Sequence, residues 1–430
     1  MARNFEFVSG VFLLFLLVHS FYIYPPINSS MLSVFFLFAL AFVFKQSFLT
    51  TTYKLSTHKN LISLYFLILL MFLASISIPF LHGTLDLSYS KNFISQTIQL
   101  VLIIFVFSFI FHNYKEKRFT PTEFAERLIV WIFVMQSVVQ ILAFLSPQIA
   151  SIVHLFYTDK AFERLYVGYG GIRGLALTGS PGWGLAVGYG LAFLFYVKAY
   201  IVNRKITVVT ISLGLLLVLG TFFAGQSGFV GAILGIVFYL VASGNPVIKI
   251  RNAVYGLVLL LGLVLAVYFS LPNFVALLQD RVFPFVFEFL YKYASTGELQ
   301  TNSTNILMQM WAVEISDITY LIGTGWFTDP NTGAYYMHTD VGYIRNVLFG
   351  GIVWIFFLFL YQAKLIGLNY VNYKSTPKNT KKLIVFIFIY LAILEAKAMT
   401  IGFNKYMFSI VVFYSLALVY ERYFWKRSTT

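Results

Sequence analysis

Three side chains near residue 340 have the chemical types needed for catalysis. His338 and Asp340 lie two residues apart, and Arg345 follows them inside an apolar run. A histidine of near-neutral pKa can accept a proton from a hydroxyl group, and we predict His338 and Asp340 to be catalytic. The structural alternative is that either residue caps the helix that begins near here. Arg345 needs a partner or a path to the membrane surface, because a charge in an apolar segment is costly.

A second stretch combines two arginines with many glycines. Arg164 and Arg173 could hold phosphate groups, because a guanidinium forms bidentate hydrogen bonds with phosphate oxygens and keeps its charge. The alternative is that both contact lipid headgroups near the end of a span. Glycines would let the backbone approach a ligand closely, and Pro181 predicts a broken start to the next helix. The glycines are Gly168, Gly170, Gly171, Gly174, Gly179, Gly182 and Gly184.

Other kinds of site receive little support. The sequence contains no cysteine, no HExxH motif and no Walker motif, so we expect neither a metal nor a cofactor. Glu395 is a further functional candidate, because it lies deep in an apolar segment. Lys397 lies two residues beyond it, at a spacing that is poor for a direct ion pair.

Composition places the chain in the membrane class. Of its 430 residues, 59% are hydrophobic and 11% are charged, whereas soluble domains carry about 25% charged residues. The net charge of +14 comes from short basic clusters between apolar runs, which argues against a nucleic-acid partner. Membrane lipid is the expected surrounding.

The apolar runs predict an all-α polytopic protein with about twelve spans in one integral membrane domain, residues 1–430. Each run is long enough, or nearly so, to cross the hydrocarbon core as a helix. We expect the first run to be a retained span. The predicted spans are 5–24, 31–49, 61–81, 93–112, 124–145, 176–200, 206–223, 229–243, 252–271, 344–366, 383–400 and 403–423.

The distribution of Lys and Arg orients these spans. With the N-terminus in the cytoplasm, 21 of the 30 Lys and Arg residues fall on the cytoplasmic side, as the positive-inside rule requires. Both termini are therefore predicted to be cytoplasmic. Two long segments, 146–175 and 272–343, are predicted outside, the second between spans 9 and 10. Within the second, residues 304–319 have the pattern of an amphipathic helix.

Three local patterns carry a family resemblance. Arg173-Gly174-Leu175 is followed by Pro181 and small residues, and residues 221–235 read TFFAGQSGFVGAILG. The third pattern runs from Gly323-Thr324-Gly325 through His338 and Asp340 to Gly350-Gly351. With the span plan, these patterns resemble the O-antigen polymerases (Wzy type) and the related O-antigen ligases.

The resemblance implies glycosyl transfer at the outer face of the bacterial inner membrane. The donor would be a glycan on undecaprenyl diphosphate, and the acceptor a new lipid-linked repeat unit. His338 would be the base, and Arg164, Arg173 and Arg345 would bind diphosphate. The chain departs from the family at Gln226-Ser227-Gly228 and at 302–305, where arginines are common in relatives, so Arg281 is the expected substitute. A chain-length regulator protein is an implied partner.

Two other functions stay open at this point. An O-antigen ligase would use the same donor but a different acceptor, the lipid A core. A lipid-linked oligosaccharide flippase would be a transporter, for which ionisable residues near the bilayer midplane and two similar halves are expected. The ionisable residues here gather in the outer segments, and no internal repeat is evident.

Overall fold

The computed structural model describes residues 2–24, 27–33, 35, 45–112, 114, 119–167, 171–286, 288–297 and 302–425. The chain is mostly helical, at 76%, and six of the described helices are long and apolar enough to cross a membrane. It therefore has the build of a membrane-embedded helical protein. The six are α4 (Lys59–Leu81), α5 (Ser90–Phe111), α6 (Pro121–Leu145), α9 (Trp183–Tyr196) with its π-helical continuation η2 (Val197–Ile201), α12 (Pro246–Ser270) and α18 (Gly342–Leu365).

The remaining elements are shorter or carry more charge. Five further helices of the bundle are α1 (Ala2–His19), α10 (Val208–Ala224), α11 (Gly228–Val241), α19 (Lys378–Glu395) and α20 (Lys405–Tyr423). The others are α3 (Lys45–Ser56), α7 (Pro147–His154), α8 (Asp159–Phe162), η1 (Glu163–Val167), α13 (Pro272–Leu277), η3 (Leu278–Val282), α14 (Phe283–Val286), α15 (Glu288–Thr296), α16 (Asn302–Trp311), α17 (Asp317–Ile322), η4 (Tyr336–His338) and η5 (Leu368–Asn372). A small antiparallel hairpin joins β1 (Tyr22–Tyr24) to β2 (Ile27–Asn28).

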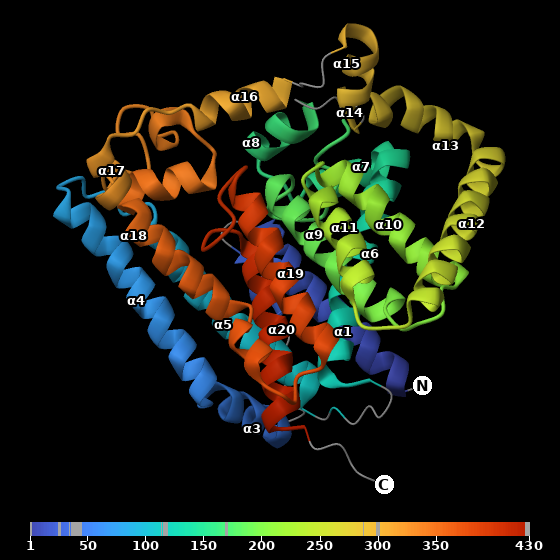
Figure 1. The fold of residues 1–430 in the computed structure, drawn as a ribbon, viewed down its shortest axis with the longest axis horizontal. Coiled ribbons are helices and arrows are strands. Elements are labelled where there is room, and N and C mark those ends of the chain that lie inside the picture. The colour runs from blue at the N-terminus through green and yellow to red at the C-terminus, as the bar shows by residue number, and fades with distance from the viewer. Residues whose placement is uncertain are drawn as a thin grey trace.

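The long helices run between two ends of the molecule (Figure 1). Both chain termini and α3 lie at one end, which we call the terminal end. The short helices α7, α8 and α13 to α17 lie at the other, which we call the loop end. The two segments that the sequence predicts outside, 146–175 and 272–343, therefore lie at the same end of the bundle.

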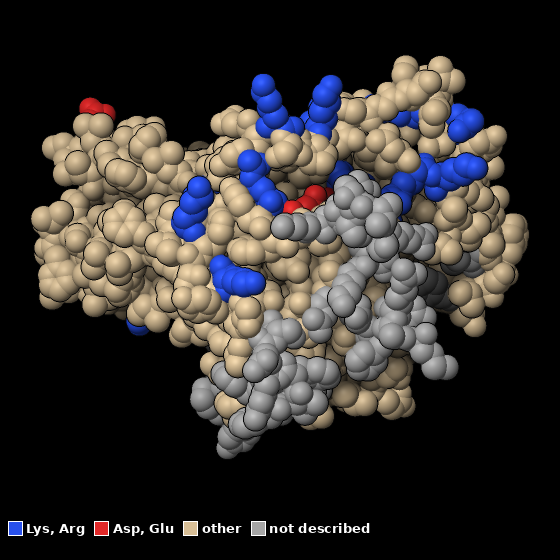
Figure 2. Space-filling view, turned by 90° about the horizontal axis from the view of Figure 1, so that it is seen from below, with Lys and Arg blue, Asp and Glu red and all other residues tan. Residues whose placement is uncertain are grey.

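Basic side chains gather at the terminal end. Seen from below, this face carries many Lys and Arg side chains and few acidic ones (Figure 2). Two ion pairs tie neighbouring helix ends here, with Lys198 3.5 Å from Glu126 and Arg204 3.6 Å from Glu123. Both pairs join the start of α6 to η2 or to the residues just beyond its end.

The centre of the bundle is α9, which packs against α6, α10, α11, α19 and α20. Its glycines permit this crowding. A Cβ added to Gly231 of α11 would overlap the backbone of Gly190 in α9, so these two helices approach as closely as their backbones allow. At the periphery, α12 has its main contacts with only α10 and α13, and most of its apolar side chains are exposed.

Several predicted boundaries are corrected by the structure. The span predicted at 176–200 begins as a helix only at Trp183, after an irregular stretch that ends at Gly182 with a φ of 113°. This is the broken start that Pro181 indicates. The single amphipathic helix predicted at 304–319 is wrong, because α16 ends at Trp311 and Ser316 caps a separate α17 by accepting the Thr319 N–H.

Predicted spans 61–81, 93–112, 124–145, 206–223 and 229–243 each coincide with a described helix. The span predicted at 31–49 falls largely outside the described residues, and α3 begins only at Lys45.

Helix α18 is broken in the half that lies toward the loop end. Gly350 and Gly351 depart from helical geometry, and Gly351 has a φ of 69° and a ψ of −170°. Backbone carbonyls freed by the break are bonded from outside the helix, because the Thr324 N–H donates to the Leu348 carbonyl at 2.7 Å. The Gly325 N–H donates to the Phe349 carbonyl at 3.0 Å. The sequence indicated one continuous span at 344–366, so the break is a correction.

Candidate functional site

A cavity of about 950 Å³ opens at the loop end and collects residues from distant parts of the chain. Five parts of the chain line it: the end of α1 with the β hairpin, Asn92 of α5, residues 164–184, residues 333–345 and residues 398–406. Its volume is at the upper end of the range, about 300–1,000 Å³, for pockets that hold a small ligand. The two predicted outer segments therefore meet at one cavity, a contact that the sequence alone does not establish.

The lining is strongly cationic. Arg164, Arg173, Arg345 and Lys405 line the cavity, against a single described acidic residue, Asp340. Guanidinium groups stay protonated at any physiological pH, so most of this charge is permanent. A cavity of this sign concentrates anions, and its arginines suit oxygen-rich groups such as phosphate.

Arg345 is the most enclosed of the four cations. Its side chain is only 4% exposed, and its guanidinium carbon lies 3.5 Å from the ring centroid of Tyr335 and 4.1 Å from that of Phe327. The two rings hold the planar group through cation–π contacts. Its buried Nη2 has no hydrogen-bond partner within the described part of the chain. A buried donor left unbonded costs free energy, so this guanidinium is held at a cost in stability.

A buried hydrogen-bond network fixes the helix start that carries Arg345. Asn346 donates to the Glu395 carboxylate at 2.9 Å and accepts from the Tyr89 hydroxyl at 3.0 Å. Glu395 also accepts the N–H groups of Thr400 and Ile401, each at 2.8 Å. Glu395 is thus bonded within the bundle rather than among the residues that line the cavity, and it braces the base of the site.

Arg173 lies on a different wall, beside the turn between α10 and α11. Its Nη2 is 3.6 Å from the position that a Cβ would take at Gly225. On the same turn, the Lys397 ammonium donates to the Ser227 hydroxyl at 3.0 Å. The Gln226-Ser227 turn itself has no basic residue, and these two cations border it from other segments.

The remaining predicted residues lie in different places. Asp340 lines the cavity and is exposed within it, and Arg164 is an exposed member of the lining. His338 is exposed on η4, outside the lining, with a φ of 52°. Arg281 belongs to η3, and its side chain lies outside what the structure describes.

Several residues that line the cavity were not predicted from the sequence. Asn404 caps α20 and Lys405 is its first residue, and both line the cavity, although the sequence shows only a lone basic residue after a short turn. His19, at the end of α1, also lines it. The His19 ring is nearly buried and lies 3.3 Å from the Tyr406 hydroxyl. Lys405, Asn404 and His19 all lie where a helix begins or ends at the loop end of the molecule, and this shared position is what could have identified them.

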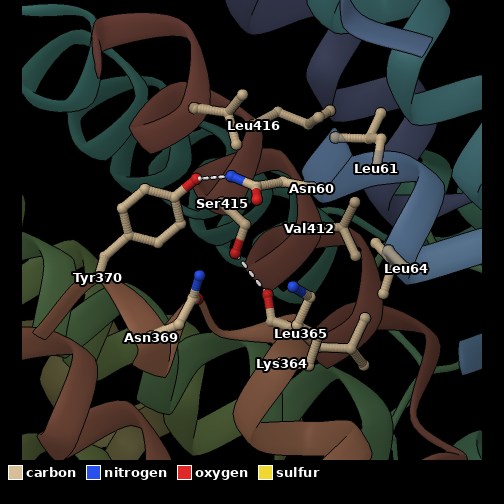
Figure 3. A pocket seen from close by; sticks show the side chains of 12 residues that line it. Asn60, Leu61, Leu64, Lys364, Leu365, Asn369, Tyr370, Val412, Ser415 and Leu416 are labelled. Carbon is tan, nitrogen blue, oxygen red and sulfur yellow. Dashed lines mark hydrogen bonds between the residues drawn. The ribbon is translucent and has the colours of Figure 1, made fainter. Parts of the chain in front are cut away.

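A second pocket lies at the terminal end, between α4, α18, η5 and α20 (Figure 3). It holds only about 30 Å³, which is room for about one water molecule. Asn60 donates to the Tyr370 hydroxyl and Ser415 donates to the Leu365 carbonyl across it. This pocket is too small for a sugar or a diphosphate, so the loop-end cavity is the candidate site.

The turn between α4 and α5 anchors the segment that covers Arg345. Asp86 accepts the N–H groups of Phe327 at 2.9 Å and Thr328 at 2.6 Å, and that of Ser88 at 3.0 Å. Burial alone would raise the pKa of Asp86, but these hydrogen bonds to the charged carboxylate outweigh it and lower the pKa below its usual 3.8.

This lowered pKa gives a pH-dependent prediction. The stabilisation from Asp86 is complete above its unfolded pKa of 3.8 and is lost as pH falls through the lower folded value. We expect the amides of Phe327 and Thr328 to keep equal hydrogen-exchange protection from pH 7 to pH 5, after correction for intrinsic rates, and to lose it only below about pH 3.8. Loss already at pH 5 would show that another group holds this segment.

Comparisons with known proteins give no family for the chain. No family model, curated protein or solved structure matches it. The loop-end cavity and the residues that line it are therefore the features from which a function is inferred.

Proposed function

We propose that this chain is an O-antigen polymerase, or a polymerase of a related surface polysaccharide. It would transfer a glycan from undecaprenyl diphosphate to a lipid-linked repeat unit at the outer face of the bacterial inner membrane. The observation that carries the proposal is the cavity at the loop end, where Arg164, Arg173, Arg345 and Lys405 face one carboxylate. A diphosphate is the anion that the donor of such a reaction would bring.

The chemistry needs little besides charge and position. The bond between the donor sugar C1 and the diphosphate oxygen breaks, and a bond forms between C1 and the acceptor hydroxyl oxygen. The hydroxyl proton passes to a base, and undecaprenyl diphosphate leaves with the electron pair of the broken bond. Fixed cations stabilise the charge that develops on the leaving diphosphate. Holding both substrates in one cavity supplies the orientation.

Asp340 and His338 remain the proposed catalytic residues. Asp340 has the more direct position, because it lines the cavity on the wall that also bears Arg345. His338 lies two residues away on the exposed η4 turn, outside the lining. On the proposed mechanism, one of them accepts the acceptor proton, and substrate binding must bring His338 into reach if it is the base.

The proposed topology follows from charge. Twelve spans with both termini in the cytoplasm would put the basic face of Figure 2 inside and the cavity outside. Lipid-linked repeat units are delivered at that outer face, so the proposed substrates and the cavity would meet there. A chain-length regulator is the proposed protein partner.

Deleting the gene tests the function. We expect cells without it to carry lipid A core capped with a single repeat unit and no longer chains, read as bands on a lipopolysaccharide gel. A plasmid copy of the natural gene should restore the ladder, and a copy with His338→Ala should not, because proton removal by a positioned base typically contributes about 10²-fold or more.

Two other phenotypes would overturn the proposal. Core without any repeat unit would indicate a ligase, and repeat units held on the inner leaflet would indicate a flippase. Equal protein levels, measured by immunoblot of the membrane fraction, are needed before His338→Ala is interpreted. A normal ladder with that variant would remove His338 from the mechanism while leaving the polymerase proposal in place.

A further inference from the structure

The turn at residues 82–88 fastens a segment far along the chain. Thr84 donates to the Gly325 carbonyl at 3.0 Å, and the His82 ring lies 3.2 Å from the Ile322 carbonyl. Asp86 adds its two bonds from the N–H groups of Phe327 and Thr328. Residues 322–328 are thus held by the α4–α5 turn immediately before the chain reaches the cavity.

Two routes lead from Asp86 to Arg345. In the first, Asp86 fixes the backbone of Phe327, whose nearly buried ring lies 4.1 Å from the Arg345 guanidinium. In the second, Thr328 forms an isolated antiparallel bridge with Tyr335, and the Tyr335 ring lies 3.5 Å from the guanidinium on another side. Asp86 thus bonds the backbone of Phe327 directly, and it bonds the backbone of Thr328, which pairs with Tyr335. In this way it fixes the backbone that positions both rings beside Arg345.

We propose that Asp86 is a positioning residue for Arg345, holding the guanidinium in the cavity wall where it can bind a phosphate group of the substrate. This inference rests on the proposed function for the nature of the ligand. Asp86 itself does not line the cavity, so it acts only through the segment 327–335.

The chemistry of the contact requires a carboxylate. Three backbone N–H groups converge on the two oxygens of Asp86, and an ionised carboxylate is the side chain that only accepts. An asparagine would turn an NH₂ group toward at least one of these donors. Either Ser88 in the turn or the pair Phe327 and Thr328 in the segment would then face the NH₂ group, losing hydrogen bonds and gaining a repulsive contact, while the side-chain volume stayed the same.

A double-mutant cycle tests the inference. The probe is undecaprenyl diphosphate, and its Kd is measured on the purified full chain in lipid nanodiscs for the natural protein, Asp86→Asn, Arg345→Gln and the double variant. We expect Asp86→Asn to weaken binding about tenfold in the natural protein. In the Arg345→Gln background the same substitution should change Kd less than about twofold, because Asp86 then has no guanidinium to position.

The outcomes separate the two hypotheses. If Arg345→Gln leaves Kd unchanged, the proposed function fails at this residue and the inference fails with it. If Arg345→Gln weakens binding but Asp86→Asn weakens it equally in both backgrounds, only the inference is overturned. Glu421→Gln is the matched control, because Glu421 also accepts a backbone N–H, from Thr122 at 2.9 Å, but at the terminal end. It should leave Kd unchanged.

Should Asp86→Asn yield too little folded protein, Phe327→Leu takes its place in the cycle. Phe327→Leu removes one of the two rings beside Arg345 and leaves the hydrogen bonds of Asp86 intact. It should also weaken binding only when Arg345 is present. Equal weakening in both backgrounds would overturn the inference.

Discussion

Replacing Arg345 with glutamine, or Arg173 with alanine, should abolish long glycan chains. Each removes a permanent positive charge from the cavity that is proposed to hold the diphosphate. The loss of one preorganised group that stabilises developing charge typically lowers the rate by about 10²–10³-fold. Because a chain of many units needs many transfers, such a loss would leave core with a single repeat unit. The measurement is a lipopolysaccharide gel from deletion cells that carry each variant.

Arg345→Lys separates charge from geometry. It keeps the positive charge but loses the planar group that lies between Tyr335 and Phe327, and lysine cannot form the paired hydrogen bonds of a guanidinium. We expect short chains rather than none. Lys374→Gln is the control, because Lys374 is exposed at the terminal end of the bundle. A full ladder with Arg345→Gln at normal protein level would rule out the assignment of this cavity as the diphosphate site.

Gly351→Ala should prevent accumulation of folded protein. Gly351 has a φ of 69° and a ψ of −170°, a backbone region that is essentially restricted to glycine. An added Cβ would also overlap the Leu321 carbonyl of α17, which packs against α18. Strain and overpacking together should cost about 3–5 kcal/mol, a large part of a typical stability. Size-exclusion chromatography and thermal melting of detergent-solubilised protein will measure this.

Gly262→Ala is the matched control for that substitution. Gly262 lies within α12, and nothing stands within 4 Å of the position its Cβ would take. Alanine is favoured over glycine inside a helix by roughly 1 kcal/mol, so this variant should melt at or above the natural temperature. A Gly351→Ala protein that melts with the natural one would show that α18 can be straight at this point.

The sequence predicts a helix correctly where the hydropathy of the segment alone determines that it forms one. The runs at 61–81 and 124–145 are helices because unbroken apolar segments of this length satisfy their backbone only internally. It also predicts the Pro181 break, since proline acts locally. It does not predict the break at Gly350 and Gly351 in α18, because glycine is also common in membrane helices that are unbroken. That break depends on the approach of α17 and residues 323–325, which is a tertiary contact.

The candidate site is predicted by residue type but only partly by position. Arg345 stands out because a charge in an apolar run is costly, and Arg173 because it is an arginine among glycines that let the backbone approach a ligand. Both line the cavity. Lys405 and His19 were not predicted, because each is flanked mainly by apolar residues in the sequence. Each reaches the cavity only because the end of its helix packs there. The contacts of the Phe327 and Tyr335 rings with Arg345 were also not predicted, because the bridge between Thr328 and Tyr335 brings the two rings together.

The break in α18 bears on how the protein is assembled during synthesis. The carbonyls of Leu348 and Phe349 receive their hydrogen bonds from Thr324 and Gly325, and an unbonded carbonyl in hydrocarbon costs several kcal/mol. The loop-end half of α18 therefore cannot take its final shape in the lipid until residues 323–325 have docked against it. Those residues leave the ribosome first, so each newly made chain carries its own template for the break before the helix that needs it has been inserted.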